Sequence, residues 1–166
     1  MLTGIFGRKR SGKTTLGKGL SLDAWQSEQR RSLVFDFKGS DWGGHSVVFL
    51  TLEPFLASYA KSRNCEVFFD DAGLSINRNR DLMQFFTMAE SDGRSTTVIG
   101  HSGADLLPGM RAQFDRVYFF RQPFEVLEKW YEIFHDKRIY WAAELDPFEF
   151  LDMDLYRDPL IRRLKL

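Results

Sequence analysis

The sequence predicts an α/β fold of three layers, in which helices cover both faces of a mostly parallel central β-sheet. Short apolar segments alternate with longer helical patterns from Leu2 to Phe120, the order of strands and crossover helices in a parallel sheet. One segment, from Glu66 to Asp71, is apolar on both faces through Val-Phe-Phe, as a central strand must be. The 166 residues, 43% of them hydrophobic, are enough for one domain with its own core.

The elements before Pro123 follow from residue type and spacing. The first helix should place on one face Leu16, Leu20, Ala24 and Trp25. Pro54 lies near the first turn of the second helix, where proline is tolerated. We expect strands at residues 2–6, 33–37, 47–50, 66–71, 96–100 and 116–120, helices at 15–31, 52–63 and 77–92, and a short helical stretch around 104–113.

The pattern changes after Pro123, which divides the expected domain 1–166 into a core at 1–122 and a C-terminal part at 123–166. Residues 129–134 and 138–143 are compatible with a β-hairpin around residues 135–137, which we favour, and a helix over 124–134 is equally compatible. Beyond Pro147 we expect a partly helical tail with Arg162 and Arg163 exposed.

The segment between the first strand and the first helix is Gly-Arg-Lys-Arg-Ser-Gly-Lys-Thr, residues 7–14, and fits the P-loop pattern at every fixed position. Its glycines let the chain curl so that backbone N–H groups point at phosphate oxygens, and the helix that follows adds its positive dipole end. The fold expected is therefore a RecA-like P-loop NTPase fold that binds ATP. We expect the nucleotide to contact Gly7, Arg8, Lys9, Arg10, Ser11, Gly12, Lys13, Thr14 and Thr15.

Within this loop, Lys13 is expected to reach the β- and γ-phosphates and Thr14 to offer its hydroxyl to Mg²⁺. The strand at 66–71 ends in two acids, which resembles a Walker B element. There the first acid, Asp70, would hold Mg²⁺ and the second, Asp71, would be the general base for the attacking water. Capping of the following turn is the alternative role for these acids.

Two polar residues, His101 and Ser102, end the strand expected at 96–100. If this strand lies between the strands that carry the two motifs, one of these side chains is in position to sense the γ-phosphate and to help place the water. A histidine satisfied within its own loop is the alternative.

Composition narrows the environment and the partners. The formal net charge is zero, so no global field draws the chain to nucleic acid or an anionic membrane. The basic residues between Gly73 and Gln122 are all arginines, which suit phosphate contacts, although surface ion pairs also explain them. The single cysteine, Cys65, should pack in the core of a protein from a reducing compartment. No run approaches the roughly 18 apolar residues of a membrane-spanning helix, and no signal peptide is expected, so we expect a soluble protein.

With these elements together, the chain resembles the FtsK/HerA group of P-loop motor ATPases and, within it, the small ATPases that package viral genomes. Filamentous-phage assembly ATPases of the Zot type are similar too. The matching segments are the P-loop and residues 34–41, 68–73, 93–102 and 110–119. Two departures are Asp71, where glutamate is usual, and the pair His101 and Ser102, where an amide is common.

The resemblance implies a pentameric or hexameric ring that encloses double-stranded DNA and translocates it into a preformed capsid, in the host cytoplasm or at the virion packaging vertex. Its partners would be DNA, copies of itself, and capsid or portal proteins. In such rings an arginine reaches the γ-phosphate of the neighbouring subunit. The candidates are Arg78, Arg80, Arg111 and Arg116, and we favour Arg111.

Three alternatives stay open from the sequence. One is a phage assembly or extrusion ATPase of the Zot type, although no membrane-spanning segment is expected here. Another is a small P-loop nucleotide or metabolite kinase, in which residues 73–94 would form an arginine-rich lid. The third is a non-catalytic nucleotide switch, in which Asp71 is too short to act.

Overall fold

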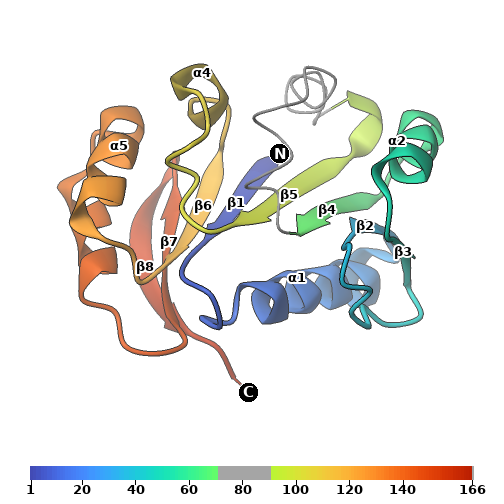
Figure 1. Ribbon diagram of the computed structural model, residues 1–166, viewed down its shortest axis with the longest axis horizontal. Coiled ribbons are helices and arrows are strands. Elements are labelled where there is room, and N and C mark those ends of the chain that lie inside the picture. The colour runs from blue at the N-terminus through green and yellow to red at the C-terminus, as the bar shows by residue number, and fades with distance from the viewer. Residues whose placement is uncertain (71–90, 166) are drawn as a thin grey trace.

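The computed structural model of the chain describes residues 1–70 and 91–165. In these residues an eight-stranded sheet runs in the order β3-β2-β4-β5-β1-β6-β7-β8 (Figure 1). The first six strands of this order are mutually parallel. The last two, β7 and β8, are antiparallel to their neighbours. Their bounds are β1 Leu2–Phe6, β2 Ser32–Phe35, β3 Ser46–Phe49, β4 Glu66–Asp70, β5 Ser95–Gly100, β6 Arg116–Phe120, β7 Glu149–Asp154 and β8 Arg157–Arg163.

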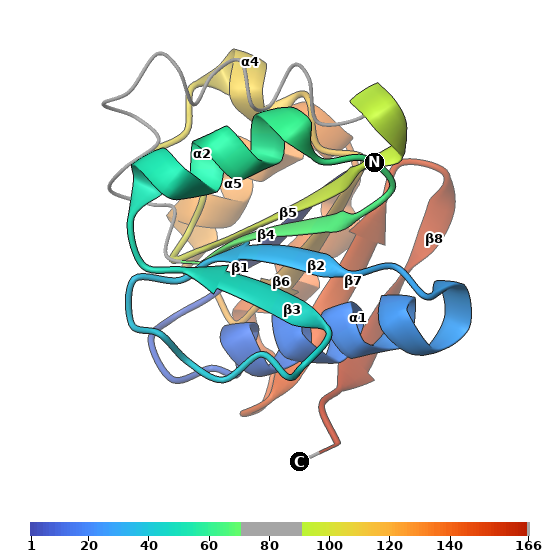
Figure 2. The ribbon, with the colours of Figure 1, turned by 90° about the vertical axis from the view of Figure 1, so that its right-hand side faces the viewer.

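Helices cover both faces of this sheet, which confirms the predicted three-layer α/β fold. Helix α1 lies along one face, whereas α2, α4 and α5 lie over the other, as both views show (Figures 1 and 2). The helices are α1 Lys13–Glu28, α2 Leu52–Lys61, α4 Pro108–Arg111 and α5 Phe124–Phe134, with two 3₁₀ helices, η2 Ser91–Gly93 and η3 Lys137–Ala143.

The sheet separates two apolar clusters, because successive residues of a strand point to opposite faces. In β1, Ile5 packs with the cluster on the α1 face, whereas Phe6 joins the larger cluster under α2, α4 and α5. In β4, Phe68 and Phe69 divide in the same way. The strands of the parallel core are therefore apolar throughout, which is why they could be recognised from sequence.

Helix α1 lies close to the sheet because its buried positions are small. Gly17 and Ser21 are its buried residues, whereas Leu16 and Leu20 are partly buried. A Cβ at Gly17 would lie 2.7 Å from Cδ1 of Ile99 in β5 and 3.2 Å from the ring of Trp42. This close approach sets the position of the loop that precedes the helix.

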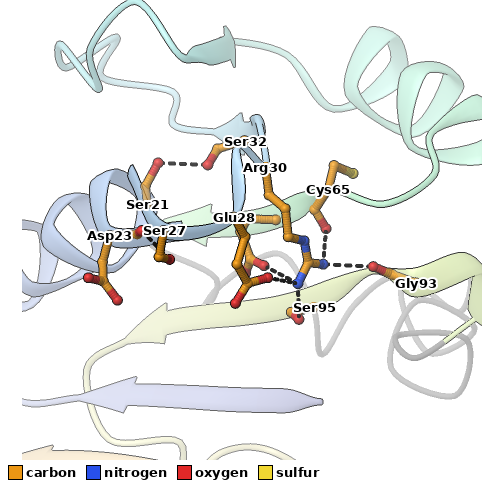
Figure 3. Close-up of polar contacts among 10 residues, drawn as sticks. Ser21, Asp23, Ser27, Glu28, Arg30, Ser32, Cys65, Gly93 and Ser95 are labelled. Carbon is orange, nitrogen blue, oxygen red and sulfur yellow. Dashed lines mark hydrogen bonds and ion pairs between the residues drawn. The ribbon is translucent and has the colours of Figure 1, made fainter. Parts of the chain in front are cut away.

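Arg30, which follows α1, makes polar contacts at the starts of β4 and β5 (Figure 3). Its guanidinium donates to the carbonyl oxygens of Cys65 and Gly93 at 3.2 and 2.7 Å, and it lies 2.9 Å from the carboxylate of Glu66. Cys65 itself is buried in the larger cluster, as predicted. These contacts join the end of α1 to the starts of β4 and β5.

The predicted hairpin at 129–134 and 138–143 is wrong. Residues 124–134 form helix α5, the alternative that the sequence left open, and residues 137–143 form η3. Leu127 and Trp130 of α5 are fully buried, a spacing that a helix turns to one face. Asp136 begins η3 by accepting a hydrogen bond from the backbone N–H of Arg138 at 2.8 Å.

The C-terminal hairpin lies later in the chain, in the region expected to be a partly helical tail. β7 pairs with β6 and β8 pairs with β7, so the hairpin extends the sheet rather than packing on it. Arg162 and Arg163 are exposed, as predicted, with side-chain exposures of 52% and 61%, and both form ion pairs. The helix expected at 77–92 lies largely outside the described residues.

Candidate nucleotide site

The loop between β1 and α1 curls as the P-loop pattern requires, and two of its glycines have no room for a side chain. A Cβ at Gly7 would lie 2.5 Å from Cβ of Phe120 and 2.8 Å from Oγ of Ser11. Gly12 has a φ of 102°, and a Cβ there would lie 2.5 Å from Cδ1 of Leu164. Arg10 also has a positive φ, 65°, so the backbone reverses its direction within the loop. Backbone that alternates in this way forms the concave nests of N–H groups that bind anions in proteins.

The start of α1 is open toward this nest. Its N-cap is Gly12, which supplies no side-chain hydrogen bond, and the first turn contains no acid. The buried Oγ of Ser11 has no hydrogen-bond partner among the described residues. Uncapped N–H groups, the positive dipole end of a helix and an unsatisfied hydroxyl together suit an anion.

Lys13 and Thr14 both make hydrogen bonds at the P-loop. The Nζ of Lys13 donates to the carbonyl oxygen of Arg8 at 2.8 Å, so the ammonium lies across the mouth of the loop. Thr14 Oγ1 donates to Oδ2 of Asp70 at 2.8 Å, although the two residues are 56 positions apart. Thr15 is exposed one residue further along the helix.

The pair of Thr14 and Asp70 fits a magnesium ion by the chemistry of its donors. A hydroxyl and a carboxylate are hard oxygen ligands, and Mg²⁺ in nucleotide sites takes one or two carboxylates together with substrate phosphates. Asp70 is 6% exposed at the end of β4. The described residues contain no cluster of three or more His, Cys, Asp or Glu side chains that could hold a metal without such phosphates.

The sheet order explains how distant residues meet here. β5 lies between β1, which leads into the P-loop, and β4, which ends in Asp70. The register pairs Phe6 with Gly100 and Asp70 with Ile99, so these carboxyl ends lie at one edge of the sheet. His101 and Ser102 follow directly from β5, between the two motifs, as the sequence predicted.

These two residues differ in their surroundings. His101 is exposed, and its carbonyl oxygen accepts a hydrogen bond from Nε2 of Gln122 at 2.7 Å. Ser102 Oγ accepts from the N–H of Ala104 at 3.2 Å, and its carbonyl accepts from Nε1 of Trp130.

Sequence analysis missed Gln122, which is 3% exposed and holds the tip of β5; its isolated position after β6 gave no signal. Asp71, the predicted general base, lies outside the described residues.

Asp36 is a second residue that sequence analysis did not single out. It directly follows β2, which lies beside β4, and it is 1% exposed. Its carboxylate accepts hydrogen bonds from Nε1 of Trp42 and the N–H groups of Lys38 and Ser40. Burial alone would raise its pKa, but hydrogen bonds from Ser40, Trp42 and Lys38 lower the pKa below the ordinary value of 3.8. Asp36 thereby shapes the loop that follows β2, beside the strand that ends in Asp70.

The arginines expected to act on a neighbouring subunit are engaged within this chain where they are described. Arg111 is 4% exposed, and its guanidinium donates to the carbonyl oxygens of Ala104 and Leu106 at 3.1 and 2.7 Å. Arg116 makes two hydrogen bonds to the carboxylate of Asp152, at 2.7 and 2.5 Å. Arg78 and Arg80 lie outside the described residues.

No family model matches this chain, and no curated protein sequence matches it either. Solved structures do match it over almost its whole length. The genome packaging NTPase B204 from Sulfolobus turreted icosahedral virus 2, in complex with sulfate, has a TM-score of 0.82 at 16% sequence identity, covering 99% of this chain and 97% of that chain. The chain has the fold of this NTPase.

Two further solved structures have a similar fold. B204 from Sulfolobus Turreted Icosahedral Virus, a DNA-packaging ATPase, has a TM-score of 0.77 at 17% identity and covers 98% of this chain and 96% of that chain. The cytoplasmic domain of EccC, the Type VII secretion ATPase of Thermomonospora curvata, has a TM-score of 0.71 at 14% identity; this chain is covered to 98%, that chain to 25%. At the level of fold, these matches confirm the predicted resemblance to FtsK/HerA-type packaging ATPases.

Other B204 structures from virus 2 are complexes with AMP, AMPPCP and ATP-gammaS. Among the described residues of the present chain, no helix is both long and apolar enough to span a membrane.

Proposed function

We propose that this chain is an ATPase that packages viral double-stranded DNA into a preformed capsid as a ring. The observation that carries the ATPase part is the hydrogen bond of 2.8 Å between Thr14 and Asp70, which closes the P-loop onto the end of β4. It joins the phosphate nest to a buried carboxylate, with the tip of β5 between them. The likeness to B204 NTPases supports the packaging part.

In this proposal each residue has a separate task. The P-loop N–H groups and Lys13 bind the phosphates and stabilise the charge that develops on the γ-phosphate. Bound Mg²⁺, held by Thr14 and Asp70, would supply further charge neutralisation. Asp71 accepts the proton of the attacking water, and His101 or Ser102 orients that water at the tip of β5.

Turnover tests the ATPase part. Lys13→Ala should lower ATP hydrolysis by at least about a hundred-fold, because it removes a charge that stabilises the transition state. Asp71→Asn should lower it by roughly a hundred-fold or more while ATP binding persists, since the amide cannot accept the proton. Lys61→Ala is the matched control, because Lys61 is exposed at the end of α2.

Undetectable turnover in the wild type, with ATP binding intact, would favour the non-catalytic switch instead. A kinase predicts a different response, in which a nucleoside monophosphate stimulates ATP consumption and is itself phosphorylated. Either result would contradict the proposal that this chain is a DNA-packaging ATPase.

Duplex DNA tests the translocation part. DNA should stimulate hydrolysis, and the stimulation should fall as salt rises, because phosphate contacts release counterions. Negative-stain electron microscopy of the protein with an ATP analogue and DNA should show rings with a central channel. Monomers under these conditions, together with no stimulation at low salt, would refute DNA packaging and leave an ATPase without this role.

A further inference from the structure

Beside the P-loop, on the side away from Asp70, the surface contains a hollow of about 160 Å³. Arg8, Arg10 and Ser11 of the P-loop form one wall, and Phe120 and the turn at residues 145–149 form the other. Pro147 and Phe148 make much of the turn apolar. The proposed hydrolysis uses none of these turn residues.

Phe148 is the unusual residue in this hollow. Its φ is 66°, and among the described residues with a positive φ it is the only apolar side chain other than glycine. A bulky residue rarely adopts this conformation, because its Cβ crowds the backbone. The residue is nevertheless 38% exposed, and its Cδ1 would lie 3.5 Å from a Cβ at Gly12. The chain thus holds an aromatic face at the phosphate loop in a conformation that glycine would adopt more easily.

The carboxylates of the turn are already paired. Arg163 contacts Oδ2 of Asp146 at 3.4 Å and Oε1 of Glu149 at 3.1 Å, and Glu149 also accepts from the N–H of Asp146. Leu164, the next residue, donates its N–H to the carbonyl oxygen of Phe148 at 3.0 Å. These contacts hold the turn in place and pair its carboxylates, while Phe148 stays exposed as its aromatic side chain.

The sheet order gives the direction in which a bound nucleotide would lie. Thr14 and Asp70 would hold Mg²⁺, which neutralises charge on the terminal phosphates in nucleotide sites, so their contact would mark the γ-phosphate side of the loop. That side faces β5 and β4, whereas β6 and β7 flank the loop on its other side. The α-phosphate and the nucleoside must therefore extend toward β6 and β7, which lead into and out of the hollow.

We propose that this hollow is the nucleobase subsite and that Phe148 is the surface on which the base stacks. The inference rests on the proposed function, since it assumes that a nucleoside triphosphate binds the P-loop. Every nucleobase has a flat π-face, so an exposed aromatic ring held beside a phosphate nest suits this ligand class.

Titration calorimetry with two magnesium-bound ligands, ATP and inorganic tripolyphosphate, separates base contacts from phosphate contacts. Phe148→Ala should weaken ATP binding roughly ten-fold, the size of a lost base-aromatic stack. Tripolyphosphate, which has no base, should bind the variant and the wild type alike. Phe148→Tyr keeps the ring and should keep ATP affinity within about two-fold of the wild type.

Phe148→Gly distinguishes the loss of the stacking ring from a loss of stability. Glycine adopts a positive φ without strain, so its melting temperature should equal or exceed that of Phe148→Ala while ATP affinity stays low. Tyr156→Ala is the matched control, because Tyr156 is 84% exposed in the β7–β8 turn, at the other end of β7 from Phe148.

The proposal is overturned if Phe148→Ala and Phe148→Gly bind ATP as the wild type does, or if they weaken ATP and tripolyphosphate equally. Failure of the proposed function gives a different pattern. In that case the wild type binds neither ligand, or Lys13→Ala binds both as tightly as the wild type.

Discussion

At the scale of single residues, Asp152 shows how the C-terminal strands are joined. Its side chain is 4% exposed in β7, between Arg116 of β6 and Arg162 of β8. Arg116 makes two hydrogen bonds to it, and Arg162 lies 3.0 Å away. A buried carboxylate is tolerated because both neighbouring strands neutralise it.

Asp152→Asn should therefore destabilise the protein by about 2–4 kcal/mol, because it leaves Arg116 partly buried without its partner charge. Urea unfolding measures the loss. Asp158→Asn is the control: its partner is Arg138, its side chain is 86% exposed, and the change should stay below about 0.5 kcal/mol. Equal losses in the two variants would show that the position of Asp152 between the strands has no special weight.

At the scale of elements, the sequence predicted the parallel core well and the C-terminal part poorly. The core strands are continuous apolar runs with clear turn residues between them, so short-range patterns suffice. In β7 the apolar run is interrupted by Asp152, and β8 contains Pro159, which usually argues against a strand. Asp152 is acceptable in β7 because it forms ion pairs with both neighbouring strands, and Pro159 is acceptable in β8 because β8 lies at the edge of the sheet. Neither the ion pairs nor the edge position can be predicted from local sequence.

The candidate site also contains residues that the sequence predicted and residues that it did not. The P-loop and Asp70 follow from motifs, since their chemistry requires fixed residue types at fixed spacing. Gln122 and Phe148 carry no such pattern, because their positions depend on how β6 ends and β7 begins, and β6 lies beside β1. The burial of Arg111 within its own loop was equally invisible, since its partners are backbone carbonyl oxygens.

The loop after β2 provides a pH-dependent prediction. Asp36 has a lowered pKa when folded, so its hydrogen bonds stabilise the protein above about pH 4, and this contribution is lost as pH falls through the folded value. Asp36→Asn should thus be less stable than the wild type at neutral pH, and the difference should shrink in acid. Urea midpoints measured from pH 7 to pH 3 check this, with Asp23→Asn, an exposed carboxylate in α1, as the control. A difference that grows on acidification would contradict the assignment.

At the scale of the whole molecule, the proposed ring needs an arginine from a neighbour, and the described chain holds Arg111 inward. We expect Arg111→Ala to lower the melting temperature, because the loop at residues 103–107 loses the hydrogen bonds that hold its carbonyl oxygens. We also expect no recovery of ATPase activity when Arg111→Ala is mixed with Lys13→Ala. Recovery in the mixture would contradict this and show that an intact Arg111 completes the site of the adjacent subunit.

The two ends of the described chain lie at opposite edges of the sheet. Met1 pairs with the start of β5 through the N–H of Thr96, whereas Leu164 lies against Gly12 in the P-loop. A fluorophore attached beyond Leu164 would therefore sit beside the proposed nucleotide site and should report nucleotide binding and release, whereas the same dye before Met1 should not. A purification tag should accordingly be placed at the amino end, so that the phosphate loop stays accessible.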